Sequence, residues 1–213
     1  MSEGIKKRQN TLLASLLLSL WAPLATGLAV IVSRSVTQVS DFIRRTMELL
    51  VLLLSWLVFR YLAGREDITP QEKQKWERIV NLSVAAALAV SGAIMFVLAI
   101  LYHQNSRPGG NVVPGLIIAI LGFIVNLWFY RRYKALGKEE PSTIMDAQRQ
   151  LYLAKVLVDT CVIAALGTVF LWPDHPITRY VDAAGSVGGA FYLLWSSVRM
   201  LRQNGANALS KQE

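Results

Sequence analysis

Two groups of charged residues interrupt the apolar segments of this chain. The first group has four members, Asp41, Arg44, Arg45 and Glu48. Their spacing of three, four and seven residues from Asp41 puts them on one face of an α-helix. The second group is the i, i+4 pair Lys155 and Asp159. Charges inside a membrane are costly and usually face protein or water, so we predict that the two groups meet between helices.

Two kinds of chemistry follow from this set of charges. The formal charges of the six residues sum to zero, so they can form a closed network of ion pairs. If the pairs open, the carboxylates can carry protons and the cations can hold an anion, as in many transporters. If they stay closed, the network only holds the helices together, although buried pairs are weak sources of stability. Asp41 is also explained by the favourable placement of an acidic residue near a helix N-terminus.

The segments that must position these charges are long and apolar. Hydrophobic residues make up 54% of the 213-residue chain and charged residues only 17%, which favours membrane helices over a soluble core. We predict an all-α, polytopic membrane protein with six transmembrane helices. Their expected ranges are 11–33, 38–62, 77–103, 112–131, 148–172 and 178–201. A transmembrane domain over 11–202 would then lie between polar tails at 1–10 and 203–213.

The distribution of Lys and Arg predicts the orientation. Sixteen of the 22 basic residues fall at the two termini, in the connection after the second helix and in the connection after the fourth. Only Arg34, Arg107 and Arg179 fall at the opposite ends, and three more are intramembrane. Cytoplasmic segments carry the excess of positive charge. We therefore expect both termini in the cytoplasm, with the protein in the cell inner membrane.

Several other functions lack support in the residues. The single cysteine, Cys161, excludes an intrachain disulfide and a cysteine-based zinc cage. Both histidines, His103 and His175, are expected in solvated outer loops. No nucleotide-binding, metalloprotease or nucleophile motif is present, so we expect neither an enzyme nor a cofactor, and no nucleic-acid partner. Gly185 and Gly189 form a small-residue face that fits either packing within the bundle or dimerisation.

The order of several short motifs resembles the cation diffusion facilitator family of six-helix metal exporters. Ser35 through Asp41 resembles the serine-rich entry to the second helix of that family, and Lys75-Trp-Glu77 resembles its GKxE stretch. Ser91-Gly92 and Pro108 fit later landmarks. The final helix contributes three more residues at similar spacing, Asp182, Tyr192 and Arg199. The resemblance covers residues 11–205 and implies the fold, a lipid bilayer as surroundings, transport of a small ion or proton, and a homodimer.

The same resemblance identifies an unusual site. Members of the family hold a divalent ion with two ligands from the second helix and two from the fifth. At the matching positions this chain has Arg44 with Glu48 and Lys155 with Asp159, so one cation replaces a ligand in each pair. Because arginine has no lone pair to donate, we expect no bound metal. The expected function is a secondary transporter of efflux or antiport type, with a substrate or proton pathway through Arg44, Glu48, Lys155, Asp159, Asp41, Arg45 and Asp182. The alternatives are a non-transporting scaffold or regulatory relative locked by the ion pairs, and a divalent metal exporter.

Overall fold

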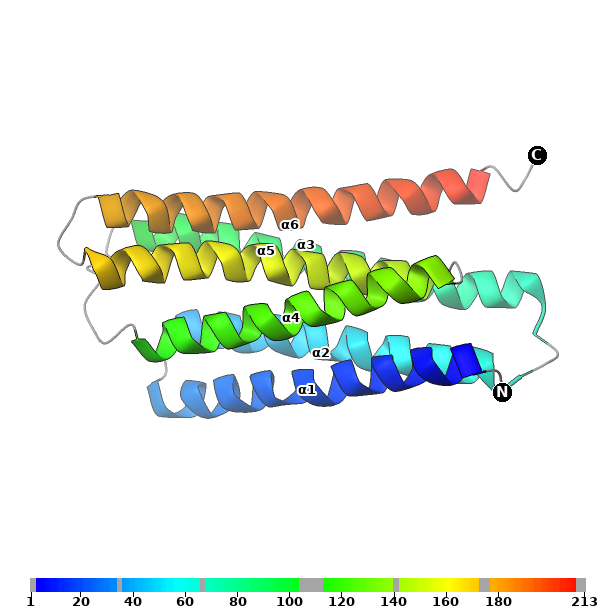
Figure 1. The fold of residues 1–213 in the computed structure, drawn as a ribbon. Helices are drawn as coiled ribbons and strands as arrows, with labels where there is room; N and C mark the ends of the chain where they lie inside the picture. The colour runs from blue at the N-terminus through cyan, green and yellow to red at the C-terminus, as the bar shows by residue number, and fades with distance from the viewer. Residues whose placement is uncertain are drawn as a thin grey trace.

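Six helices, each antiparallel to the next along the chain, make up nearly all of the described structure (Figure 1), which is a computed structural model. It describes residues 3–33, 36–65, 68–103, 113–139, 142–172 and 177–209. The helices are α1 Glu3–Ser33, α2 Val36–Ala63, α3 Pro70–His103, α4 Val113–Glu139, α5 Thr143–Leu171 and α6 Ile177–Leu209. The prediction of an all-α, six-helix membrane protein is confirmed.

The helices pack in neighbouring pairs around α5. α1 lies along α2, α4 along α5, and α3 along α6, while α5 also packs on α6 and α3. α1 begins and α6 ends at the same end of the bundle, here called the terminal end (Figure 1). The last turns of α2 and α4 and the first turns of α3 and α5 are at this end as well.

Apolar side chains cover the outside of the bundle as well as its centre. Trp21 is 75% exposed, Phe191 72% and Ile118 63%, and such a surface needs a lipid environment rather than water. Four segments among the described residues are long and apolar enough to span a membrane. They are Arg44–Ala63, Pro70–Val97, Leu116–Glu139 and Thr143–Thr168. The chain is therefore an integral membrane protein.

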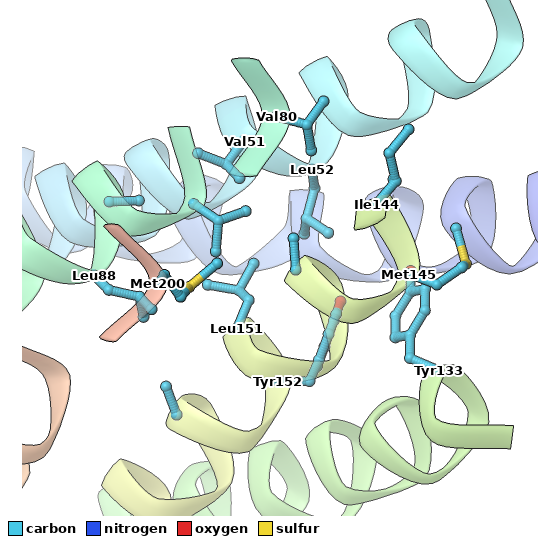
Figure 2. Close-up of a cluster of buried hydrophobic side chains, with 14 of the residues drawn as sticks. Val51, Leu52, Val80, Leu88, Tyr133, Ile144, Met145, Leu151, Tyr152 and Met200 are labelled. Atoms are coloured by element: carbon cyan, nitrogen blue, oxygen red, sulfur yellow. The ribbon is translucent and has the colours of Figure 1, made fainter. Parts of the chain in front are cut away.

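The buried core gathers side chains from all six helices. Leu12 of α1, Leu52 of α2, Val80 of α3 and Met200 of α6 are all fully buried in it. Figure 2 shows Leu52, Val80 and Met200 in one buried cluster with Leu151 of α5. Because α5 meets most of the other helices, polar residues on its inner face are enclosed by protein.

Several helices extend further than the apolar pattern predicts, and for α1 and α4 the reason is that their polar ends have partners. α1 begins at Glu3 rather than Thr11, and its Arg8 is buried with Nη2 donating to the Leu136 carbonyl at 3.2 Å. Lys7 of α1 pairs with Glu139 at 2.5 Å, so the first turns of α1 pack on the last turns of α4. α6 likewise continues to Leu209, beyond the predicted start of the C-terminal tail.

The early start of α3 has a local sequence cause. Pro70 occupies the first helical position, where its fixed φ and missing N–H are tolerated. Thr69 precedes it and its Oγ1 accepts a hydrogen bond from the Glu72 backbone N–H at 3.3 Å. A Thr followed three residues later by Glu is a helix N-terminus signature. The capping pattern therefore adds one and a half to two turns to the predicted helix.

Close approach of α3 and α6 depends on glycine. A Cβ added at Gly92 would lie 2.9 Å from Leu194 Cγ and 3.1 Å from the Ala190 carbonyl oxygen. A Cβ added at Gly189 would lie 2.9 Å from Met95 Cε. The small-residue face of α6 therefore packs within the bundle, which is the first of the two expected uses of that face.

Candidate intramembrane ion-pair site

Glu48 is the centre of the charged cluster. Its Oε2 lies 3.2 Å from Lys155 Nζ on α5, and its Oε1 lies 3.7 Å from Arg44 Nη1 one turn earlier on α2. Each oxygen of the carboxylate therefore faces one cation. The three side chains are 11–20% exposed, which places the contact between helices rather than on the lipid-facing surface.

Lys155 is held by an aromatic ring as well as by Glu48. Its Nζ lies 4.9 Å from the centre of the Tyr152 ring, a distance at which an ammonium is attracted to the ring face. Tyr152 is fully buried and stacks on Tyr133 with ring centres 5.4 Å apart. Their hydroxyl groups hydrogen-bond to serines of α1, Tyr133 with Ser15 at 2.7 Å and Tyr152 with Ser19 at 3.3 Å. This packing links the position of Lys155 to α4 and α1.

Asp159 lies one turn beyond Lys155 and is bound from a different helix. Asn126 Nδ2 of α4 donates a hydrogen bond to Asp159 Oδ2 at 2.7 Å. Gly122, one turn from Asn126, lies beside the same carboxylate, since a Cβ built there would be in ordinary contact with Asp159 Oδ2 at 3.6 Å. Arg44 and Lys155 act on Asp159 through electrostatic attraction at longer range. The site therefore joins α2, α4 and α5.

The structure thus brings Arg44, Glu48 and Lys155 into contact and sets Asp159 beside them. Arg45 contributes to the positive field at Glu48. The side chains of Asp41 and Asp182 lie outside the described ones, so their place in the predicted pathway stays a prediction. The role of the whole set as a substrate or proton pathway also stays a prediction.

Polar residues that the sequence interpretation did not include belong to the same interface. Asn126 is one, and its signal was an isolated amide within the apolar segment 116–131. Tyr152 and Gln148 are two more. Together with Lys155 and Asp159 they recur on α5 at intervals of four, three and four residues, the spacing of one helical face.

No cluster in the described part of the chain has the composition of a metal site. No group of three or more His, Cys, Asp or Glu side chains there lies close enough to hold a metal ion. Cys161 is partly buried in α5, where its backbone carbonyl lies against Gly185 of α6. The donors that zinc prefers are nitrogen, oxygen and sulfur atoms in a tetrahedral array, and the cluster at Glu48 offers carboxylates flanked by cations instead.

Long apolar helices that enclose a charged cluster define a polytopic membrane protein with an intramembrane polar site. Comparison with known families gives a more specific result. The family model of the cation efflux transmembrane domain matches residues 12–207, and no curated protein sequence matches the chain. The chain belongs to the cation efflux family, whose members are cation transporters of the cation diffusion facilitator kind.

Proposed function

We propose that the protein is a secondary transporter of a monovalent cation, coupled to protons, and that its site does not bind zinc. The observation that carries the proposal is the contact between Lys155 Nζ and Glu48 Oε2 at 3.2 Å, between α2 and α5. By resemblance, these two positions hold the transported ion in the family. The ammonium of Lys155 therefore occupies a place that a substrate cation would take.

The charge of the site favours a singly charged substrate. Glu48 is already balanced by Lys155 and Arg44, so a divalent ion entering here would add uncompensated positive charge in a region of low dielectric. A monovalent cation or a proton that displaces Lys155 from Glu48 keeps the local charge closer to neutral. Asp159, held by Asn126, is a carboxylate one turn away on the same helix that can receive the displaced ammonium.

Flux measurements on the purified protein in liposomes test this proposal. With an imposed pH gradient, we expect uptake of Na⁺ or K⁺ by the wild type and its loss in Glu48→Gln, with no Zn²⁺ or Mn²⁺ flux. Zinc flux by the wild type would instead support the divalent metal exporter. The absence of any ion flux would support a non-transporting scaffold locked by the ion pairs, and either result would overturn the proposal.

Orientation and assembly complete the proposal. We place both termini in the cytoplasm because of the distribution of Lys and Arg. A cysteine introduced at Glu3 should resist impermeant thiol reagents in intact cells, and ready labelling would contradict this orientation.

We also expect a homodimer by resemblance to the family. Native mass spectrometry that detects only monomer in several detergents would contradict the dimer.

A further inference from the structure

A fully buried amide on α5 has a hydrogen-bond partner for one of its two polar atoms within the described part of the chain. Gln148 is 0% exposed, and its Nε2 donates to Ser55 Oγ of α2 at 2.6 Å. Ser55 is equally buried and donates in turn to the Val51 carbonyl at 2.7 Å. Among the residues that the structure describes, none supplies a hydrogen bond to Gln148 Oε1. Exchanging the nitrogen and oxygen of the amide would leave the nitrogen unpartnered instead.

Such an atom indicates a missing partner. Buried polar atoms nearly always have a hydrogen-bond partner, and where protein supplies none, an ordered water commonly does. Gln148 Oε1 can accept a hydrogen bond from such a water, and Ser55 Oγ, which donates to Val51 and accepts from Gln148, keeps one lone pair that can accept another. The neighbours of Gln148 on the same face of α5, Ile144, Met145 and Leu151, are fully buried. Their side chains carry no hydrogen-bond donor that could reach Oε1.

The position of the pair relates it to the ion-pair site. Gln148 lies seven residues before Lys155 on α5, and Ser55 lies seven residues after Glu48 on α2. Seven residues at 1.5 Å rise correspond to about 10 Å along the helix. The Gln148–Ser55 pair therefore lies between the ion pair and the terminal end, on the same α2–α5 interface. Leu52 and Leu151, both fully buried and both labelled in Figure 2, lie between these two levels along α2 and α5.

We infer that Gln148 and Ser55 bind a water molecule on an aqueous path from the terminal end of the bundle to Glu48 and Lys155. In the conformation described, Leu52 and Leu151 form an apolar layer between this water site and the ion pair. The path opens when Leu52 and Leu151 move apart. Gln148 then offers a hydrogen-bonding group to water or to the hydration shell of an ion. The use of this path by a transported ion rests on the proposed function, whereas the water site and the path themselves do not.

Cysteine reactivity provides a direct test. Only the thiolate reacts with methanethiosulfonate reagents, and a thiol in dry apolar surroundings stays protonated and inert. In a Cys161→Ser background, we would introduce Ser55→Cys or Gln148→Cys and measure labelling by a small hydrophilic methanethiosulfonate in liposomes. Ser55→Cys keeps the side-chain shape, so it is the variant that best preserves folding.

Two equally buried positions serve as matched controls. Ser197 of α6 is 2% exposed and donates to the Ala85 carbonyl at 2.7 Å, away from this interface. Ala154 is fully buried on a different face of α5. We expect Ser55→Cys and Gln148→Cys to be labelled at least tenfold faster than Ser197→Cys and Ala154→Cys. Equally slow labelling at all four positions, or equally fast labelling at all four, would overturn the inference.

The outcome is separable from that of the proposed function. If the wild type transports no ion but positions 55 and 148 are labelled selectively, the proposed function fails and the aqueous path stands. If the wild type transports a cation, Gln148→Leu should reduce the flux at least tenfold, while Ser197→Ala should leave it unchanged. Transport by Gln148→Leu at the wild-type rate would exclude a part for the amide in the path.

Discussion

Replacing Lys155 by Met removes one of the two cations that neutralise Glu48 and keeps a side chain of similar length. At an effective dielectric constant of about 20, unit charges 3.2 Å apart attract each other by about 5 kcal/mol. Part of this lost attraction is offset in Lys155→Met, because the variant has no ammonium group to desolvate on folding. Removing one partner of a buried ion pair costs about 3–5 kcal/mol, and we expect the lower half of that range because Arg44 remains.

Protonation of Glu48 sets an upper limit to this loss. Placing a proton on a carboxyl group with the ordinary glutamate pKa of about 4.3 costs about 3.7 kcal/mol at pH 7. The free-energy cost of this protonation falls by about 1.4 kcal/mol for each unit by which the pH is lowered. The destabilisation of Lys155→Met relative to the wild type should therefore be about 3 kcal/mol at pH 7 and no more than about 1 kcal/mol at pH 5.

Equilibrium unfolding in mixed micelles at both pH values measures these differences. Lys155→Arg, which keeps the charge, is the control for lost packing on Tyr152. The double variant Glu48→Gln with Lys155→Met should recover most of the stability, because no unpaired charge is left. An equal loss at pH 7 and pH 5, or no recovery in the double variant, would refute the reasoning that Lys155 neutralises Glu48.

Three other predictions test the neighbouring contacts. Asn126→Leu removes the hydrogen bond to a partly buried carboxylate on α5 and should lower the free energy of unfolding by about 1–3 kcal/mol. Arg44→Asp combined with Lys155→His should create a zinc site, with about 2.7 kcal/mol of stabilisation at 100 times the dissociation constant, whereas the wild type should show none in thermal melts. Gly92→Ala should destabilise by about 1–3 kcal/mol because its Cβ meets a backbone oxygen, whereas Gly188→Ala, with open space at its Cβ, should not.

Each of these has a result that contradicts it. Unchanged unfolding of Asn126→Leu would mean that the amide does not support the carboxylate. Equal zinc stabilisation of the wild type and the double variant would show that the cations do not exclude the metal, and no response in either would show that the two pairs do not face each other. Equal effects of the two glycine substitutions would contradict the close contact between α3 and α6.

Hydrophobic segments and charge spacing were sufficient to predict six helices and the meeting of α2 with α5. A charge inside an apolar segment must face protein or water rather than lipid. Glu48 and Lys155 could therefore be assigned to one interface from the sequence. The partner of Asp159 could not be predicted, because a lone asparagine in an apolar segment fits many orientations until helix rotation is known. The helix ends were placed too far inward for a related reason, since the stability of polar turns at Arg8 and Glu139 comes from contacts 128–132 residues apart.

The i, i+4 contact of Arg44 with Glu48 also bears on biosynthesis. The chain emerges from the ribosome in order, so α2 reaches the membrane about 100 residues before Lys155 has been made. During that interval Glu48 has no partner on α5, and an isolated carboxylate at the centre of a span would oppose insertion. Arg44, one turn away on the same helix, is already present. We expect this local pair to let α2 enter the bilayer early, with Lys155 joining it once α5 is inserted.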